Sequence, residues 1–360
     1  MGDSYASGIG AGTSFLSYDY TCYRYNGAYG PQVQDALNPK PPKFNDVACS
    51  AEMFDQIIAN QFADTSKEFG IRPAWGDKPD FISISMGGND IEFVPLVTRC
   101  VYNSRVFTRK SCNETITDSQ SKVHSSAFID GAGRVINKAI SEANKRQVGP
   151  SFKVFVLGYS QFFNEETTQC NDATLPRPVG TGAKLTADLR RTLNGLARDL
   201  NAALLTAAQR FNTTGQVFFV DWESKFVGHR FCDRTEPNPQ DPLTWFFTFY
   251  SDDEQTEAFF KSIPRLYDLF TDKSNDPVTE QEYLKLIGDA AGNDQTKLSI
   301  GVDWFRVFHP KSIGHSAIRD VLQDAVVKYA KASANSSATT PSAIMSSSAV
   351  GIPRGSPAVA

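Results

Sequence analysis

The chain has 360 residues, of which 41% are hydrophobic and 21% charged, so it can bury the core of one large or two ordinary domains. Its 36 basic and 40 acidic residues give a net charge of -4, and no run of lysine and arginine is long enough to follow a phosphate backbone. No apolar stretch approaches the roughly 20 residues that cross a bilayer. We therefore expect neither a nucleic-acid partner nor a transmembrane segment.

Strands and helices are predicted to alternate over most of the chain. Short runs rich in β-branched and aromatic residues predict three strands, at residues 81–85, 152–157 and 216–220. Apolar residues at helical spacing predict core-facing helices, over residues 129–143, 185–211 and 318–329. Helices long enough to cross back over a sheet are typical of parallel strands. We expect an α/β sandwich with a parallel sheet.

Residues 222–300 do not follow this alternation and are interpreted as a helical and loop insertion that could act as a lid. Capping-box patterns at Ser251–Glu254 and Thr279–Glu282 predict short helices there. The aromatic run at residues 245–250 forms either part of the core or a wall that binds an acyl group.

The two ends of the chain differ from its middle. From residue 332 the composition is dominated by Ser, Thr, Ala, Pro and Gly, which predicts one domain over residues 1–331 and a disordered tail over 332–360 that could carry O-linked sugar. The first residues lack the charged-then-apolar layout of a signal peptide.

The six cysteines nevertheless favour an oxidising compartment. None lies closer to another than twelve positions, so no C-x-x-C zinc or redox spacing exists. Six cysteines allow 15 pairings, of which the simplest is sequential: Cys22–Cys49, Cys100–Cys112 and Cys170–Cys232. Acceptor sequons begin at Asn113, Asn212 and Asn335, and together with the cysteines they predict a secreted glycoprotein.

Only four histidines are available for acid–base chemistry. His124 lies in a polar stretch, His229 reads as a turn residue, and His315 as a capping or packing residue. His309 precedes Pro310 at the entrance to the last predicted helix, where a loop can present it to a cleft. With no cluster of His or Cys at metal-ligand spacing, we expect neither a metal nor another cofactor.

Two serines compete as the nucleophile partnered by His309. Ser160 follows a predicted strand and, with Asp221, has the chain order of the α/β-hydrolases, but Phe162 stands where their elbow needs glycine. Ser4 lies in a loop of small residues, GDSYASG at positions 2–8, whose backbone can approach a substrate closely.

Companion motifs favour Ser4. The MGGND segment at residues 86–90 follows the first predicted strand and puts the Asn89 amide at a carboxyl end of the sheet. Residues 2–8 and 88–90 form two of these motifs, and the FHP of 308–310, followed by Gly314 and His315, forms a third. In these motifs the chain resembles the SGNH (GDSL-type) hydrolases, over about residues 2–330. It is most similar to their secreted, three-disulfide esterase and lipase branch in actinomycetes and fungi, which implies a flavodoxin-like fold.

That resemblance implies a mechanism. Ser4 attacks the acyl carbon, and His309 takes its proton and returns it to the leaving alcohol. The backbone N–H of Ser4, the side-chain amide of Asn89 and a backbone N–H at Ala51 form the oxyanion hole. Activity should then decline as the pH falls through the pKa of His309, about 6.5 for an unperturbed imidazole.

Three departures from the family accompany the resemblance. Ala51 replaces a glycine and puts a methyl group where a positive φ is needed. Arg306 replaces the aspartate of many relatives, so His309 is oriented either by the Arg306 backbone carbonyl, which we favour, or by Asp303. The family's core strand before the GDS motif is missing, since only Met1 precedes that motif here.

The sequence therefore predicts a secreted, monomeric serine hydrolase of carboxylic esters that contacts a lipid interface transiently. The alternative is a catalytically impaired relative that binds lipid or glycan in the same cleft. The natural ester and its acyl length are left open.

Overall fold

The computed structural model describes residues 1–14, 22–41, 43–62, 78–234, 242–249, 254–292 and 294–338. At its centre lies a parallel sheet in the order β1-β2-β3. The register places Ile84 beside Val156, and Val156 beside Phe219. The strands are β1 (Phe81–Ser85), β2 (Lys153–Leu157) and β3 (Val217–Val220), close to the predicted spans.

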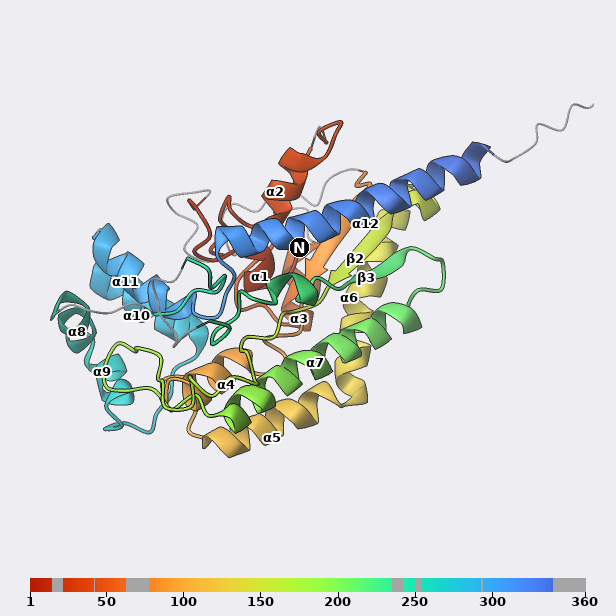
Figure 1. The fold of residues 1–360 in the computed structure, drawn as a ribbon. Coiled ribbons are helices and arrows are strands. Elements are labelled where there is room, and N and C mark those ends of the chain that lie inside the picture. Colours follow the sequence, from red (N-terminus) through yellow and green to blue (C-terminus); the bar gives the residue numbers. More distant parts are fainter. Residues whose placement is uncertain are drawn as a thin grey trace, which may run out of the picture.

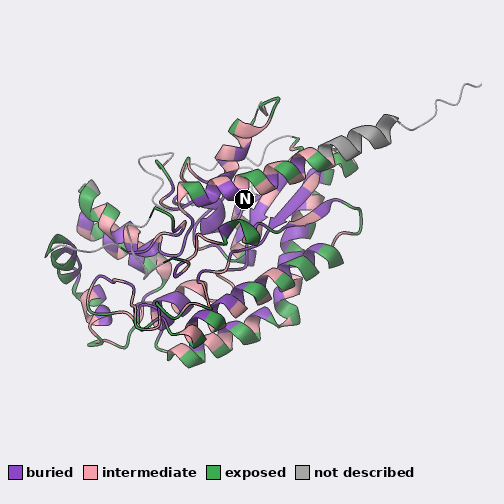
Figure 2. Cartoon of the chain, viewed as in Figure 1, coloured by how far each residue is buried: buried purple, intermediate pink, exposed green. Residues whose placement is uncertain are grey.

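Helices cover both faces of this sheet. On one side lie α4 (Phe93–Cys100), α5 (Cys112–Val123), α6 (Ser126–Lys145) and α7 (Ala187–Arg210), and on the other α2 (Tyr29–Ala36) and α12 (Ser312–Ala338) (Figure 1). The strands are buried between the two helical layers, whose outer faces are exposed (Figure 2). Since β2 has covered faces and neighbours on both edges, its Val154–Leu157 segment is continuously apolar. The predicted α/β/α sandwich is confirmed.

Residues 1–3 run along the outer edge of β1. Gly2 forms a parallel bridge with Ser85, and the Asp3 N–H donates to the Ser85 carbonyl at 3.0 Å. Short helix α1 (Ser4–Ser7) follows directly, so Ser4 stands at the carboxyl end of the sheet. Other short elements are α3 (Phe54–Gln56), η1 (Ile57–Gln61), η2 (Gly149–Ser151) and η3 (Glu223–Phe226).

The region predicted as an insertion is helical. It contains α8 (Glu254–Lys261), α9 (Pro264–Phe270), α10 (Glu280–Ala291) and α11 (Gln295–Phe305). The capping box at Thr279 forms, because its hydroxyl accepts from the Glu282 N–H and the Glu282 carboxylate accepts from the Thr279 N–H. The box predicted from Ser251 lies outside the described residues.

The aromatic run at 245–249 belongs to the core, while Tyr250 lies outside the described residues. Its backbone pairs with the segment that carries His309: the Phe247 N–H donates to the His309 carbonyl and the Phe308 N–H to the Phe247 carbonyl, each at 2.8 Å. Phe246 is buried against Phe162, Phe226 and Phe231. The aromatic run therefore supports the His309 loop through these backbone hydrogen bonds.

Three disulfides link the six cysteines in the sequential pairs Cys22–Cys49, Cys100–Cys112 and Cys170–Cys232. At the carboxyl end of the chain, α12 runs to Ala338, past the boundary at 331 predicted from composition. The rest of the predicted tail, from 339, lies outside the described residues.

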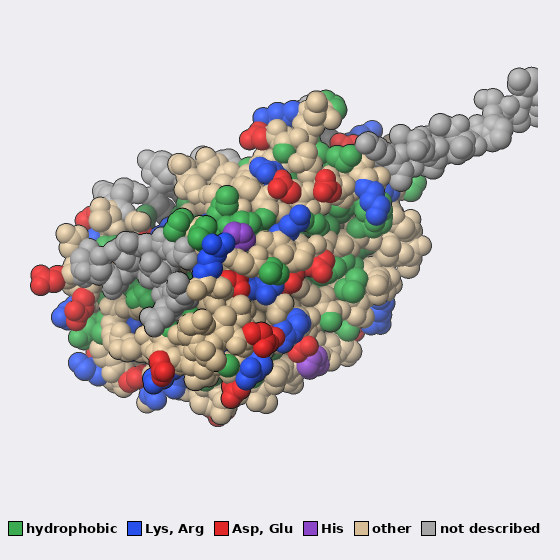
Figure 3. Space-filling model, viewed as in Figure 1, with side chains coloured by type: hydrophobic (Ala, Val, Ile, Leu, Met, Phe, Trp, Pro, Cys, Tyr) green, Lys and Arg blue, Asp and Glu red, His purple; other side chains and the backbone are tan. Residues whose placement is uncertain are grey.

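Charges of both signs are interspersed over the face drawn in Figure 3. Among the described helices, none is both long and apolar enough to cross a membrane.

Candidate active site

The structure brings Ser4 and His309 together across 305 residues of sequence. The Nε2 atom of His309 lies 2.6 Å from Ser4 Oγ. Asp3 caps helix α1 and accepts from the Tyr5 N–H at 3.0 Å, and Gly8 ends the helix in the left-handed region, at φ 67°. A Cβ on Gly8 would approach Ala28 to 2.4 Å, so this turn requires glycine. The loop of small residues thus serves to hold Ser4 at the start of a helix.

Backbone carbonyls orient His309. Its Nδ1 lies 3.1 Å from both the Arg306 and the Val307 carbonyl oxygens, so the proton on Nδ1 leaves Nε2 free to accept from Ser4. Of the two orienting groups predicted, the Arg306 carbonyl makes this contact, whereas the Asp303 carboxylate pairs with the Arg306 guanidinium at 3.0 Å. No described carboxylate hydrogen-bonds to His309.

Burial keeps this imidazole neutral. His309 is 2% exposed, and burial lowers its pKa to about 4, although the bonds to the Val307 and Arg306 carbonyls oppose this effect. A neutral imidazole at neutral pH can accept the proton of the Ser4 hydroxyl.

The predicted oxyanion donors come from three separate segments of the chain. The Asn89 amide donates one hydrogen to the Glu52 carbonyl at 3.0 Å, which fixes its orientation and leaves the second hydrogen available. Ala51 has φ 67°, the left-handed conformation that the replaced glycine adopts without strain. In the described part of the chain, neither the Ser4 nor the Ala51 N–H has an acceptor.

Two buried side chains that sequence reasoning missed tie these segments together. Gln61 accepts from the Gly2 N–H at 2.8 Å and donates to the Gly2 carbonyl at 2.7 Å. It also donates to the Glu52 carboxylate at 2.6 Å, which links the start of the chain to the loop of Ala51. Neither residue belongs to a motif that would have drawn attention to it.

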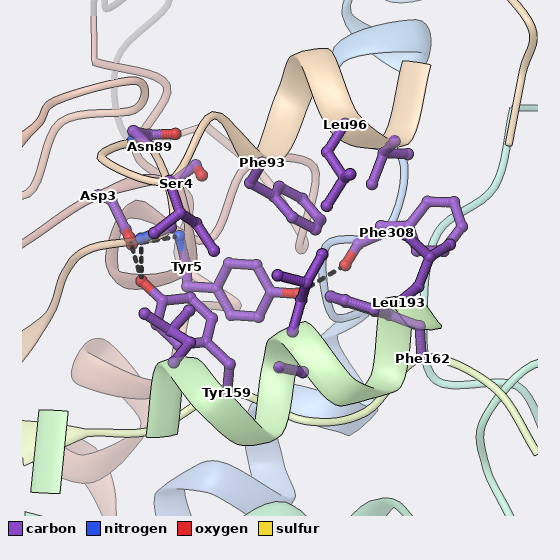
Figure 4. Close-up of a pocket in the computed structure, with 16 residues that line it drawn as sticks. Asp3, Ser4, Tyr5, Asn89, Phe93, Leu96, Tyr159, Phe162, Leu193 and Phe308 are labelled. Atoms are coloured by element: carbon purple, nitrogen blue, oxygen red, sulfur yellow. Dashed lines mark hydrogen bonds between the residues drawn. The ribbon is translucent and has the colours of Figure 1, made fainter. Parts of the chain in front are cut away.

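Tyr159 supports the cap of helix α1. Its hydroxyl donates a short hydrogen bond to the Asp3 carboxylate (Figure 4). The same carboxylate accepts from the Ser85 hydroxyl at 2.9 Å. The Gly88 N–H reaches the same phenol oxygen at 3.4 Å. Asp3 is 2% exposed, and its pKa is raised by burial, although the hydrogen bonds from these donors oppose that effect. Tyr159 thus joins the loops of Ser4 and Asn89.

A narrow cavity of about 30 Å³ adjoins Ser4 and extends between α4 and α7 (Figure 4). Its surface is almost entirely carbon. The lining residues are Asp3, Ser4, Tyr5, Gly88, Asn89 and Tyr159 together with the apolar Ile91, Phe93, Leu96, Val97, Phe162, Leu193, Leu196, Ala197, Leu200 and Phe308. The described residues of the 245–250 aromatic run do not line it, so they form core and not a wall of this cavity.

The alternative nucleophile is not assembled. Ser160 is fully buried and donates to the Gln161 carbonyl at 2.8 Å, and exposed Asp221 accepts from the Glu223 N–H. Neither contacts His309, so the arrangement considered for an α/β-hydrolase is absent from the described residues.

The remaining histidines lie apart from Ser4. His124 is exposed beside Asp199, and His229 stacks on Trp245 with ring centroids 3.6 Å apart. His315 is fully buried in α12, and neither ring nitrogen has a partner among the described residues. The described residues contain no group of His, Cys, Asp and Glu that could hold a metal ion.

The chain is similar to bacterial lipases, although no protein-family model matches it. It is 30% identical to Lipase 1 of Streptomyces coelicolor over 234 residues, which is 64% of this chain and 71% of the relative. It is 28% identical to a lipase of Streptomyces rimosus over 64% of this chain and 72% of that one. The solved phospholipase A1 of Streptomyces albidoflavus NA297 shares its fold, with a TM-score of 0.55 at 20% identity over 90% of this chain and 96% of the other.

Proposed function

Because the chain belongs to the SGNH (GDSL-type) hydrolases, alongside the actinomycete lipases, and is therefore a carboxylic ester hydrolase, we propose that it cleaves lipid esters through an acyl-enzyme on Ser4. The observation that carries this proposal is the 2.6 Å contact between Ser4 Oγ and His309 Nε2. A serine becomes nucleophilic when a base lies at this distance.

The reaction proceeds in two halves. Ser4 Oγ bonds to the ester carbon as His309 takes its proton, and the tetrahedral intermediate collapses when His309 protonates the leaving alcohol. A water molecule, deprotonated by His309, then attacks the acyl-enzyme and releases the carboxylic acid. The Arg306 and Val307 carbonyls stabilise the imidazolium that forms in each half.

The oxyanion is held by the N–H groups of Ser4 and Ala51 and by the free amide hydrogen of Asn89. Each donor of this kind contributes about a hundred- to a thousandfold in turnover when it is fixed in advance. The Asn89 bond to Glu52 supports such fixation.

The substrate is an ester with an apolar acyl group. The carbon-lined walls beside Ser4 support this choice, because an apolar group that contacts them loses contact with water without leaving polar groups unpaired. Three disulfides further support secretion, since such bonds persist in oxidising compartments.

Hydrolysis of nitrophenyl esters from acetyl to palmitoyl tests the proposal, with Ser160→Ala as the control for Ser4→Ala. We expect Ser4→Ala to lower kcat by at least about a thousandfold, to lose labelling by a fluorophosphonate, and to remain folded. Ser160→Ala should keep both ester hydrolysis and labelling by the fluorophosphonate. If the fluorophosphonate does not label Ser4 in the wild-type protein, the result would instead support the alternative, in which the protein binds lipid or glycan without cleaving it.

A further inference from the structure

A tyrosine next to the nucleophile contacts the residue next to the base. The Tyr5 hydroxyl donates to the backbone carbonyl of Phe308 at 2.8 Å, across 303 residues of sequence. Tyr5 follows Ser4, and Phe308 precedes His309. Both side chains are buried, at 3% and 0% exposure, so water does not compete for this hydrogen bond. The contact therefore links the mounts of the two reacting side chains.

The peptide between Phe308 and His309 is held at both of its polar atoms. Its carbonyl accepts from Tyr5, and its N–H donates to the Arg306 carbonyl at 3.0 Å. That Arg306 carbonyl also receives Nδ1 of His309. The direction of the imidazole thus depends on the plane of this peptide.

This peptide follows a strained residue. Phe308 has φ 65°, a conformation that side chains other than glycine rarely adopt. Such a residue keeps its conformation only where its surroundings determine it. The Phe308 ring is enclosed by Phe162, Phe163 and Phe231, but these contacts hold the side chain and not the carbonyl. The Tyr5 hydroxyl is the described hydrogen-bond donor to that carbonyl.

We propose that Tyr5 is a positioning residue, whose hydroxyl fixes the Phe308–His309 peptide and so keeps Nε2 in line with Ser4 Oγ. The inference rests on the proposed Ser4 mechanism and adds to it a residue whose hydroxyl is bonded to the Phe308 carbonyl and takes no part in the proton transfer.

The experiment must distinguish the effect of the Tyr5 hydroxyl from the packing of its ring. The ring packs edge-on against Tyr159 at 5.0 Å and beside the His309 ring at 5.1 Å between centroids. Tyr5→Phe keeps both ring contacts and removes only the donor. Tyr283→Phe is a matched control, because that buried tyrosine also donates to a backbone carbonyl, of Gly301 at 3.0 Å, between α10 and α11.

We expect Tyr5→Phe to lower kcat about 10- to 100-fold, the range caused by small displacements of catalytic groups. KM for nitrophenyl butyrate should change by less than about twofold, because the hydroxyl does not contact the substrate. The rate of labelling by a small fluorophosphonate should fall as kcat does. Thermal unfolding should show similar losses of Tm in both variants, whereas Tyr283→Phe should keep wild-type kcat and labelling.

Replacing Tyr5 by 4-aminophenylalanine restores a donor at the same place and should recover most of the labelling rate. The proposal is overturned if Tyr5→Phe labels at the wild-type rate, if Tyr283→Phe slows labelling equally, or if the folded aminophenylalanine variant is as slow as Tyr5→Phe. Should Tyr5→Phe fail to fold, the aminophenylalanine variant alone decides. Failure of Ser4 to be labelled in the wild-type protein is a separate result and refutes the Ser4 mechanism itself.

Discussion

The carboxylate of Asp303, in the last turn of α11, pairs at 3.0 Å with the guanidinium of Arg306, the residue that follows this helix. The same guanidinium lies 4.4 Å from the centroid of the Phe247 ring. The Arg306 side chain therefore forms an ion pair with the carboxylate, while its backbone carbonyl accepts a hydrogen bond from Nδ1 of His309. In the mechanism we propose, a backbone carbonyl takes the place of the triad acid, and the site is a Ser-His dyad.

Asp303→Asn tests the dyad. We expect kcat to stay within about threefold of wild type, since the carbonyls keep the His309 tautomer without this carboxylate, whereas amide replacement of a triad aspartate lowers turnover about 10⁴-fold. The measurement is steady-state hydrolysis of nitrophenyl butyrate, with His309→Gln as the inactive reference. A loss of a thousandfold or more in a folded Asp303→Asn protein would assign the orienting role to Asp303.

The conformation of Ala51 gives a second prediction. At φ 67° an alanine is strained by about 1–2 kcal/mol relative to the right-handed region, and glycine is not. Since glycine also gains entropy in the unfolded chain, we expect Ala51→Gly to raise the free energy of unfolding by no more than about 1 kcal/mol. Its kcat should be close to wild type, because the N–H keeps its direction.

Ala51→Val is the opposing variant. A β-branched residue fits this conformation poorly, so the peptide should rotate and kcat should fall about 10- to 100-fold, less than the full value of an oxyanion donor. Urea unfolding of both variants, beside their kinetics, separates stability from catalysis. A Val variant that is less stable yet fully active would remove the Ala51 N–H from the oxyanion hole.

The fold could be predicted from sequence because its signals are local. The strands at 81–85, 152–157 and 216–220 are short apolar runs, and the helix of residues 187–210 repeats leucine at helical spacing. Burial on both faces of β2 and on one face of α7 enforces these patterns. Composition predicted a domain boundary at 331, but α12 continues to Ala338, because small polar residues extend a helix that its packed half has already begun.

Much of the site could not be predicted from the sequence, because it is formed by contacts that no local pattern encodes. Ser4 and His309 were recognisable within motifs, but the bonds of Gln61 to Gly2 and of Tyr5 to Phe308 join segments far apart in the chain. A single sequence carries no sign of such a pair. Tyr5 stood inside the block at residues 2–8, and only the geometry gives its hydroxyl a partner.

The pH dependence of activity should reflect the burial of His309. General-base catalysis needs the neutral imidazole, which predominates above the pKa, and burial lowers that pKa to about 4. We therefore expect kcat/KM to hold from pH 7 to about 5 and to decline through about pH 4, below the value of about 6.5 expected from sequence alone. Circular dichroism at each pH distinguishes titration from unfolding. A decline centred near pH 6.5 in folded protein would contradict this assignment.

Burial of His315 predicts a pH-dependent term in stability. Its pKa is lowered to about 3, first by burial and second by His309, while an unfolded histidine titrates near about 6.5. Below about pH 6.5 the unfolded chain therefore binds a proton that the folded chain does not, so this residue lowers stability as the pH falls, by up to about 1.4 kcal/mol per pH unit.

His315→Met removes this term and two buried nitrogens that have no partner among the described residues. Its stability relative to wild type should therefore rise by about 2 kcal/mol between pH 7 and pH 5, measured by urea unfolding at each pH. Other titrating groups are common to both proteins and cancel in this difference. His124→Met, at a side chain that is 62% exposed, is the control for the substitution itself. An equal difference at the two pH values would mean that His315 takes up its proton in the folded protein, through a rearrangement that gives its ring a polar partner.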